Sequence, residues 1–142
     1  MQSALVSSYL QNDDETRFVE VVFPKQSNHY GTLFAGTALS LMGKAAFVAA
    51  SRRARRTVVM GSSDKVDFLQ PVLVGQIAEL RAHVVRVGTA SMTVEVEIIA
   101  ETLVSGQRVL AARGRFEMIA VDATGRPTAI ETLTPSVEDP AA

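Results

Sequence analysis

The segment TALSLMGKAAFVAASRRARR, residues 37–56, decides the fold, because it is the only long stretch of this chain with helical character. It contains no proline and is rich in alanine, leucine and methionine, all of which favour a helix. Apolar side chains lie on nearly all of its sides, so we expect the helix to be buried on most faces. Its last turn carries positive charge, which suits the negative end of the helix dipole. These cations are Arg52, Arg53, Arg55 and Arg56.

Strand patterns lie on both sides of this segment. Residues 91–101 show the clearest alternation, with apolar side chains at positions 92, 94, 96 and 98 and Thr or Glu between them. In the strand predicted at 17–23, Val19, Val21 and Phe23 share one side and Glu20 takes the other. The remaining predicted strands are 57–60 continuing through a bulge into 65–69, 76–87 and 108–121.

The order of one strand, one long helix and four strands predicts an α+β fold, in which a five-stranded antiparallel sheet wraps around one central helix. A single helix cannot both shield such a sheet and be covered itself. We therefore expect a second copy of the chain to complete the structure.

Composition narrows the possibilities further. The chain has 142 residues, which predicts a single domain, with an N-terminal arm at 1–16, the domain at 17–130 and a tail at 131–142. It has no cysteine and only His29 and His83, so no metal site is expected. A net charge of −1 argues against nucleic acid as a partner. Without a targeting signal or an apolar span, we expect a cytoplasmic protein with no membrane partner.

The candidate chemistry lies in the polar stretch NHYGTLFAG, residues 28–36, which leads into the helix. Asn28 and His29 offer a hydrogen-bond donor, an acceptor and a titratable group. The start of the helix presents unpaired N–H groups, which can stabilise negative charge on a carbonyl oxygen. From the spacing of these residues alone, a plain loop before a helix is the favoured interpretation. Nucleophile-elbow and glycine-rich nucleotide motifs are absent.

The run NHYGTLFAGTALSLMGKAAFVAASR resembles the signature of hotdog-fold acyl-CoA thioesterases, in which an N-H-x-G-T-L-F-G-G-like stretch enters the central helix. The stretches VDFLQPVLVG (66–75) and VGTASMTV (87–94) agree with it. The resemblance covers roughly residues 17–121. It implies a hotdog fold, a homodimer with active sites at the interface and further association into tetramers or hexamers. It also implies acyl-CoA as the substrate and no cofactor besides the coenzyme A of that substrate.

The resemblance also implies roles for individual residues. Asn28 matches the asparagine that positions water or the thioester, and the backbone at Phe34, Ala35 and Gly36 matches the segment that polarises the thioester carbonyl. Four further residues fall near the region that binds coenzyme A in the family. They are Arg55, Arg56, Thr89 and Ser91.

One position departs from the family pattern. The motif continues L-x-x-M-D-x-A, and its aspartate is the general base or nucleophile, whereas this chain has Gly43 there. Ser40 lies one turn earlier, but an unactivated hydroxyl is a poor substitute. Three explanations stay open: an engineered or accidental replacement in a thioesterase, a natural enzyme that uses another base such as His29, or a protein that binds acyl-CoA without turnover.

The expected function is therefore hydrolysis of acyl-CoA to free fatty acid and coenzyme A, impaired or abolished by Gly43. The alternative is a non-catalytic acyl-CoA-binding protein of the same fold. A hotdog dehydratase is a third hypothesis, but the histidine motif of that class is not visible.

Overall fold

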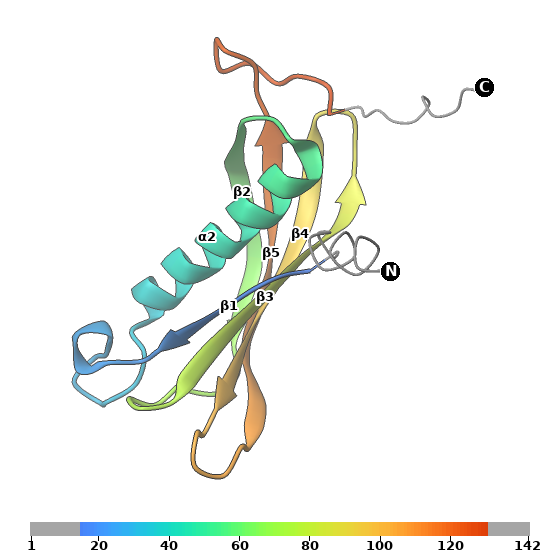
Figure 1. Cartoon of the computed structure of the whole chain (residues 1–142). Helices are drawn as coiled ribbons and strands as arrows, with labels where there is room; N and C mark the ends of the chain where they lie inside the picture. The colour runs from blue at the N-terminus through green and yellow to red at the C-terminus, as the bar shows by residue number, and fades with distance from the viewer. Residues whose placement is uncertain (1–14, 131–142) are drawn as a thin grey trace, which may run out of the picture.

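The structure is a computed structural model that describes residues 15–130. The predicted tail, and the predicted arm apart from its last two residues, lie outside the described residues. Figure 1 shows a long helix lying against one face of a twisted antiparallel sheet with the strand order β1-β3-β4-β5-β2. The elements are β1 (Thr16–Val21), a 3-10 turn η1 (Pro24–Gln26), α2 (Ala35–Ala54), β2 (Val58–Phe68), β3 (Ile77–Val87), β4 (Ser91–Glu101) and β5 (Arg108–Ala120). The predicted α+β hotdog architecture is confirmed.

Helix α2 begins two residues before the predicted start and ends at Ala54. Arg55 follows in the left-handed conformation (φ 52°), and its N–H donates to the Ser51 carbonyl at 2.7 Å, which closes the last turn. Only the face toward the sheet is buried in the single chain. On the opposite face Leu39 and Phe47 are 40% and 48% exposed, so the expected burial on most faces requires a further cover.

The buried face of α2 is rich in alanine, which lets the helix approach the sheet closely. Met42, Ala45, Ala46 and Ala50 are completely buried there. From the sheet, the even-numbered residues of β4 that the alternation singled out provide the other half of the core. They are Met92, Val94, Val96 and Ile98.

Strand β2 is a single long strand with register shifts between Met60 and Ser62 and between Asp64 and Asp67, which confirms the predicted bulge. At the second shift, Lys65 adopts a positive φ of 46°, and Gly114 lies opposite on β5. A side chain at Gly114 would place its Cβ 2.8 Å from the Val66 side chain, so the close approach requires glycine. Strand β2 forms an edge of the sheet, and most of its residues are exposed.

Strand β1 forms the other edge of the sheet. The structure shows which side of this strand faces the core, which the alternation alone could not decide. Val19, Val21 and Phe23 are exposed at 55%, 37% and 57%. The core side is instead supplied by Phe18, which packs against the core, and by Val22, which is 1% exposed. The predicted apolar side of this strand is therefore its outer side in the single chain.

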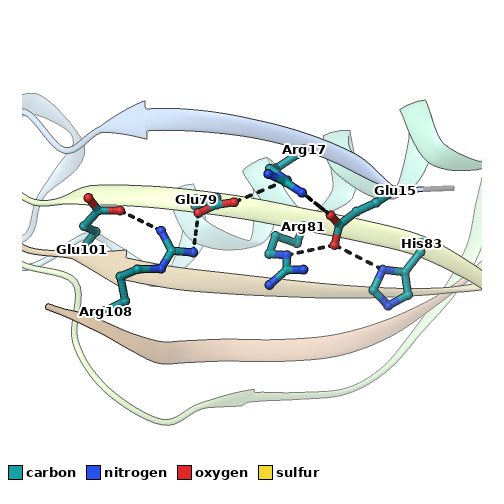
Figure 2. A network of polar contacts seen from close by, with 7 residues as sticks. All are labelled: Glu15, Arg17, Glu79, Arg81, His83, Glu101 and Arg108. Carbon is teal, nitrogen blue, oxygen red and sulfur yellow. Dashed lines mark hydrogen bonds and ion pairs between the residues drawn. The ribbon is translucent and has the colours of Figure 1, made fainter. Parts of the chain in front are cut away.

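A network of charged side chains lies on the outer face of the sheet, the face away from α2, and links β1 to the neighbouring strands (Figure 2). Glu79 is only 7% exposed, and it accepts a hydrogen bond from Arg108 at 2.6 Å and lies 3.5 Å from Arg17. Hydrogen bonding to Glu79 and then Glu101 raises the pKa of Arg108. The hydrogen bond from Arg17 and the charge of Arg81 lower the pKa of Glu15 despite some desolvation. The network consists of Glu15, Arg17, Glu79, Arg81, His83, Glu101 and Arg108.

Candidate functional site

Asn28 is held rigidly by the loop that precedes α2. Its side-chain oxygen accepts hydrogen bonds from the backbone N–H of Tyr30 at 2.9 Å, the backbone N–H of Thr32 at 3.2 Å and the Thr32 hydroxyl at 3.1 Å. Gly31 completes the turn with a φ of 80°, a conformation that favours glycine. No described residue accepts a hydrogen bond from the Asn28 amide nitrogen, so this donor is available to a ligand.

A pocket of about 280 Å³ opens beside Asn28, between the start of α2 and the strands β2, β4 and β5. Its walls are apolar apart from Asn28 and Gln70. The other lining residues are Leu33, Ala35, Ala38, Phe68, Leu69, Pro71, Val72, Ile98, Ala111 and Ala112. Apolar walls with a polar group at the edge suit a ligand that has a hydrocarbon part and a polar head.

The start of α2 contributes backbone donors to this region. The N–H of Phe34 donates to the Gln26 carbonyl at 2.9 Å, and the first N–H bonded within the helix is that of Ala38. The N–H groups of Ala35 and Gly36 have no such partner, as expected for a first helical turn. A side chain at Gly36 would place its Cβ 2.7 Å from the Phe34 ring, so glycine permits the position of that ring. Of the predicted carbonyl-polarising segment, Ala35 and Gly36 are thus the available donors.

His29 does not line this pocket. It is exposed, and its ring packs against the ring of Tyr30 with centroids 4.0 Å apart. The structure therefore brings Asn28, and not its neighbour His29, to the pocket wall.

Gly43 also lies away from the pocket within one chain. It is eight residues beyond Ala35, which corresponds to about 12 Å along a helix axis. It is partly buried on the side of α2 that faces the edge strand β2. A Cβ at this position would lie 3.3 Å from the terminal methyl carbon of Met60. One copy of the chain does not bring position 43 and Asn28 to the same cavity.

The residues predicted to bind coenzyme A lie at the other end of the molecule. Arg55 and Arg56 line an open hollow of about 520 Å³ together with Phe47, Ser51, Thr57 and Val58. Strand pairing brings Ser91, opposite Ile119, to the same end of the sheet as Val58, opposite Ala120. Thr89 and Ser91 nevertheless do not line this hollow.

A third hollow of about 470 Å³ lies on the outer face of the sheet and was not anticipated from the sequence. Its charged lining residues are Asp64, Lys65, Asp67, Glu95, Glu97, Arg113 and Arg115. They come from β2, β4 and β5, so only the strand pairing brings them together. Within residues 15–130, no group of three or more His, Asp or Glu side chains is arranged to hold a metal ion. None of the helices in this part of the chain is long and apolar enough to cross a membrane.

Known proteins share both the sequence and the fold. Residues 30–106 match the thioesterase superfamily model. An uncharacterized acyl-CoA thioester hydrolase of Bacillus subtilis, YkhA, is 38% identical over 118 residues, which is 83% of this chain and 69% of the relative. Acyl-CoA hydrolase from Staphylococcus aureus, solved with butyryl coenzyme A, coenzyme A and coenzyme A disulfide, is 32% identical, with a TM-score of 0.79 over 87% of this chain and 75% of that one.

Two further observations concern these relatives. The hexameric thioesterase from Yersinia pestis is 30% identical, with a TM-score of 0.77 over 82% of this chain and 94% of that one. Solved structures of acyl-CoA hydrolase from Staphylococcus aureus include alanine variants of an aspartate, a threonine and an asparagine. Fold, family model and identity agree, and the chain belongs to the hotdog-fold acyl-CoA thioester hydrolases of the thioesterase superfamily.

Proposed function

We propose that this chain binds acyl-CoA and hydrolyses its thioester to free fatty acid and coenzyme A, at a rate limited by the absence of a carboxylate at position 43. The observation that carries this proposal is the apolar pocket that has the Asn28 amide and unpaired helix N–H groups at its edge. The pocket accommodates the acyl chain, and each buried methylene contributes about 0.8 kcal/mol. The N–H groups of Ala35 and Gly36 polarise the thioester carbonyl because they are already oriented before the reaction.

The active unit is proposed to be a homodimer. The exposed face of α2 carries Leu39, Ser40 and Phe47, with the partly buried Gly43 beside them, and next to this face β2 presents a long unpaired edge. Such an edge is a template for pairing with another strand. Antiparallel pairing of β2 with its copy around a two-fold axis would set the two α2 helices antiparallel. The partner's Gly43 then approaches the helix start of the first subunit, so each site contains residues of both chains.

Coenzyme A is proposed to extend toward the arginine-lined hollow of the neighbouring subunit. Arg55 and Arg56 supply cations for its phosphates, and the exposed ring of Phe47 supplies an apolar surface. Thr89 and Ser91 add polar groups at the same end of the sheet. Association of dimers into larger assemblies is also proposed, in line with the hexameric relative.

The test measures binding and turnover for a panel of acyl-CoA substrates with increasing chain length, on the unchanged chain and on Gly43→Asp. We expect binding by both proteins and a rate about 10² to 10⁴ times higher for the aspartate variant, the range that a general base supplies. Lys44→Asp, which places a carboxylate one residue further along the exposed helix face, is the matched control and should give no gain. Failure of the unchanged chain and of Gly43→Asp to bind any acyl-CoA would overturn the proposal.

The second candidate function is binding of acyl-CoA without turnover. It is favoured by the surroundings of position 43, where the side chain within reach is a methionine and offers no base. Binding by the unchanged chain and by Gly43→Asp, with coenzyme A release from neither, would establish this candidate. His29→Ala addresses the remaining alternative, because an unchanged rate of release removes His29 as a substitute base.

A further inference from the structure

Strand β1 and the residue pair after it leave three large apolar side chains exposed on the outer side of the sheet. Val19, Val21 and Phe23 are 55%, 37% and 57% exposed, in the strict alternation that is typical of a buried face. Val19 pairs with Glu79 of β3, and paired residues of neighbouring strands point to the same face. Because Glu79 belongs to the charged network on the outer face, this apolar side faces away from α2. We therefore expect a cover from beyond residues 15–130.

Two further apolar side chains extend this surface at the end of the strand. The N–H of Gly75 donates to the Val22 carbonyl at 2.8 Å, which fastens the loop between β2 and β3 beside Phe23. In that loop Leu73 and Val74 are 48% and 38% exposed. Contiguous apolar surface of this kind on a water-soluble fold marks a contact site. The name β1 patch is used below for Val19, Val21, Phe23, Leu73 and Val74.

The carboxylates beside the β1 patch already have partners within the chain (Figure 2). Glu79, which pairs with Val19, is only 7% exposed and accepts a hydrogen bond from Arg108 at 2.6 Å. Near the start of β1, Glu15 accepts a hydrogen bond from Arg81 at 2.8 Å. A protein that covers the patch would leave these ion pairs intact, so the cost of burying an unpaired charge is avoided. An apolar centre bordered by paired charges is the composition of a protein–protein interface.

The place of β1 in the sheet indicates which protein covers it. In the strand order β1-β3-β4-β5-β2, the strands β1 and β2 form opposite edges. The proposed homodimer uses the β2 edge together with the exposed face of α2, so it leaves β1 on the far side of each subunit. The proposed association of dimers requires a second interface on every chain. The β1 patch lies where that interface would not compete with the first.

We propose that the β1 patch is the surface through which one dimer of this chain binds another. The contact is patch against patch around a two-fold axis, because an apolar side is complementary to its own copy. Each chain then uses β2 within its dimer and β1 between dimers, and two different two-fold interfaces join the dimers into a closed ring. Val19 and Phe23 form the centre of the contact. This inference rests on the homodimer of the proposed function and is independent of its chemistry.

The experiment is sedimentation velocity over a range of protein concentrations, on the unchanged chain and on the double variant Val19→Lys with Phe23→Lys. We expect the unchanged chain to sediment as an assembly of dimers and the variant as a dimer. Association of the variant should require a protein concentration at least about 30-fold higher, as expected for the loss of one anchoring side chain. The dimer itself should persist, because its interface lies at the opposite edge of the sheet.

The matched control is Val85→Lys with Val87→Lys, which adds the same charge at two other exposed valines. These residues are 44% and 39% exposed, and Val85 lies six positions along β3 from Glu79, about 20 Å away. The control should sediment as the unchanged chain does. The affinity of Val19→Lys with Phe23→Lys for acyl-CoA should stay within about twofold, because neither residue lines the pocket beside Asn28. Urea unfolding confirms that all three proteins are folded.

The outcomes separate this inference from the proposed function. Retention of the larger assembly by the Val19→Lys and Phe23→Lys variant would overturn it, and a lower unfolding free energy besides would show that the same chain covers the patch. Dissociation of this variant to monomers, or equal loss of the assembly in the control, would overturn it as well. An unchanged chain that is a dimer at every concentration would overturn it and leave the homodimer standing. A monomeric unchanged chain would overturn the homodimer too.

Discussion

Ala112→Leu should shorten the acyl chain that this protein binds. Ala112 is on β5, is 2% exposed and lines the 280 Å³ pocket beside Asn28. A leucine at position 112 would place three more carbon atoms in this pocket, in the space that the end of a long acyl chain would occupy.

The size of the effect follows from the buried hydrocarbon. A chain that fills the natural pocket loses about three buried methylenes in the variant, at about 0.8 kcal/mol each. The total of about 2.4 kcal/mol corresponds to roughly 60-fold weaker binding. A two-carbon acyl group does not reach the added side chain, so its affinity should stay within about twofold. The dissociation constant as a function of chain length should therefore show a break in the variant alone.

The assay is titration calorimetry with a series of acyl-CoA ligands of increasing length, which reports binding whether or not the ligand is hydrolysed. Ala120→Leu is the matched control for packing. Ala120 lies on the same strand, is completely buried and does not line the pocket. Leucine there should lower the free energy of unfolding by about 1–3 kcal/mol through overpacking. Ala112→Leu should leave this free energy within about 0.5 kcal/mol of the natural value, because its side chain enters existing space.

Equal loss of affinity at every chain length would refute the reasoning, because it would mean that the pocket does not hold the acyl chain. Unchanged affinity for all ligands would refute it as well. Severe destabilisation by Ala112→Leu would show instead that the space beside Asn28 is closed in solution.

Three further predictions concern stability and the coenzyme A end. Met42→Ala should lower the free energy of unfolding by about 2–5 kcal/mol, because Met42 is completely buried between α2 and the sheet; a loss below about 1 kcal/mol in urea titrations would contradict this packing. Glu15 has a lowered pKa in the fold, so its stabilising contribution is present above its ordinary pKa and lost as pH falls through the folded value. The difference in unfolding free energy between the natural chain and Glu15→Gln should therefore be largest near neutral pH and vanish well below about pH 4.3. Replacing Arg55 and Arg56 together by alanine should weaken coenzyme A binding about 3- to 10-fold at low ionic strength and have little effect at about 1 M salt, where screening acts over ~3 Å. Arg53→Ala, at the same helix end but outside the hollow, should change little, and equal losses from Arg53→Ala would point to general charge attraction.

Local patterns were sufficient for most of the fold. The helix expected at 37–56 spans Ala35–Ala54, and the strand expected at 91–101 spans Ser91–Glu101. Both elements were predictable because they depend only on the spacing of apolar side chains along one segment of the sequence. The alternation in β1 shows which residues share a side, but which side is covered depends on α2 and the other strands. For this reason Val19 and Val21 proved to lie outside the core.

Some residues of the candidate site were likewise predictable from the sequence, and others were not. Asn28 was singled out from the polar stretch before the helix and Ala35 from the family resemblance, and both line the pocket. Ile98 and Ala112 belong to strands more than sixty residues further along the chain, and they reach the pocket only through the register of β4 against β5. Likewise, nothing in the sequence around Gly43 indicates that Met60 is the neighbouring side chain.

The sequence by itself determined the order of elements, the polar entry to the helix and the residue types available for chemistry, because these depend on composition and on spacing along one segment. Only the tertiary structure decided that Asn28 borders an apolar pocket, that Gly43 lies away from it and that the Met60 side chain approaches position 43. Such contacts join segments that are distant in the chain. They depend on strand register and on which faces pack together, and those are settled by burial of the whole core and not by any one segment.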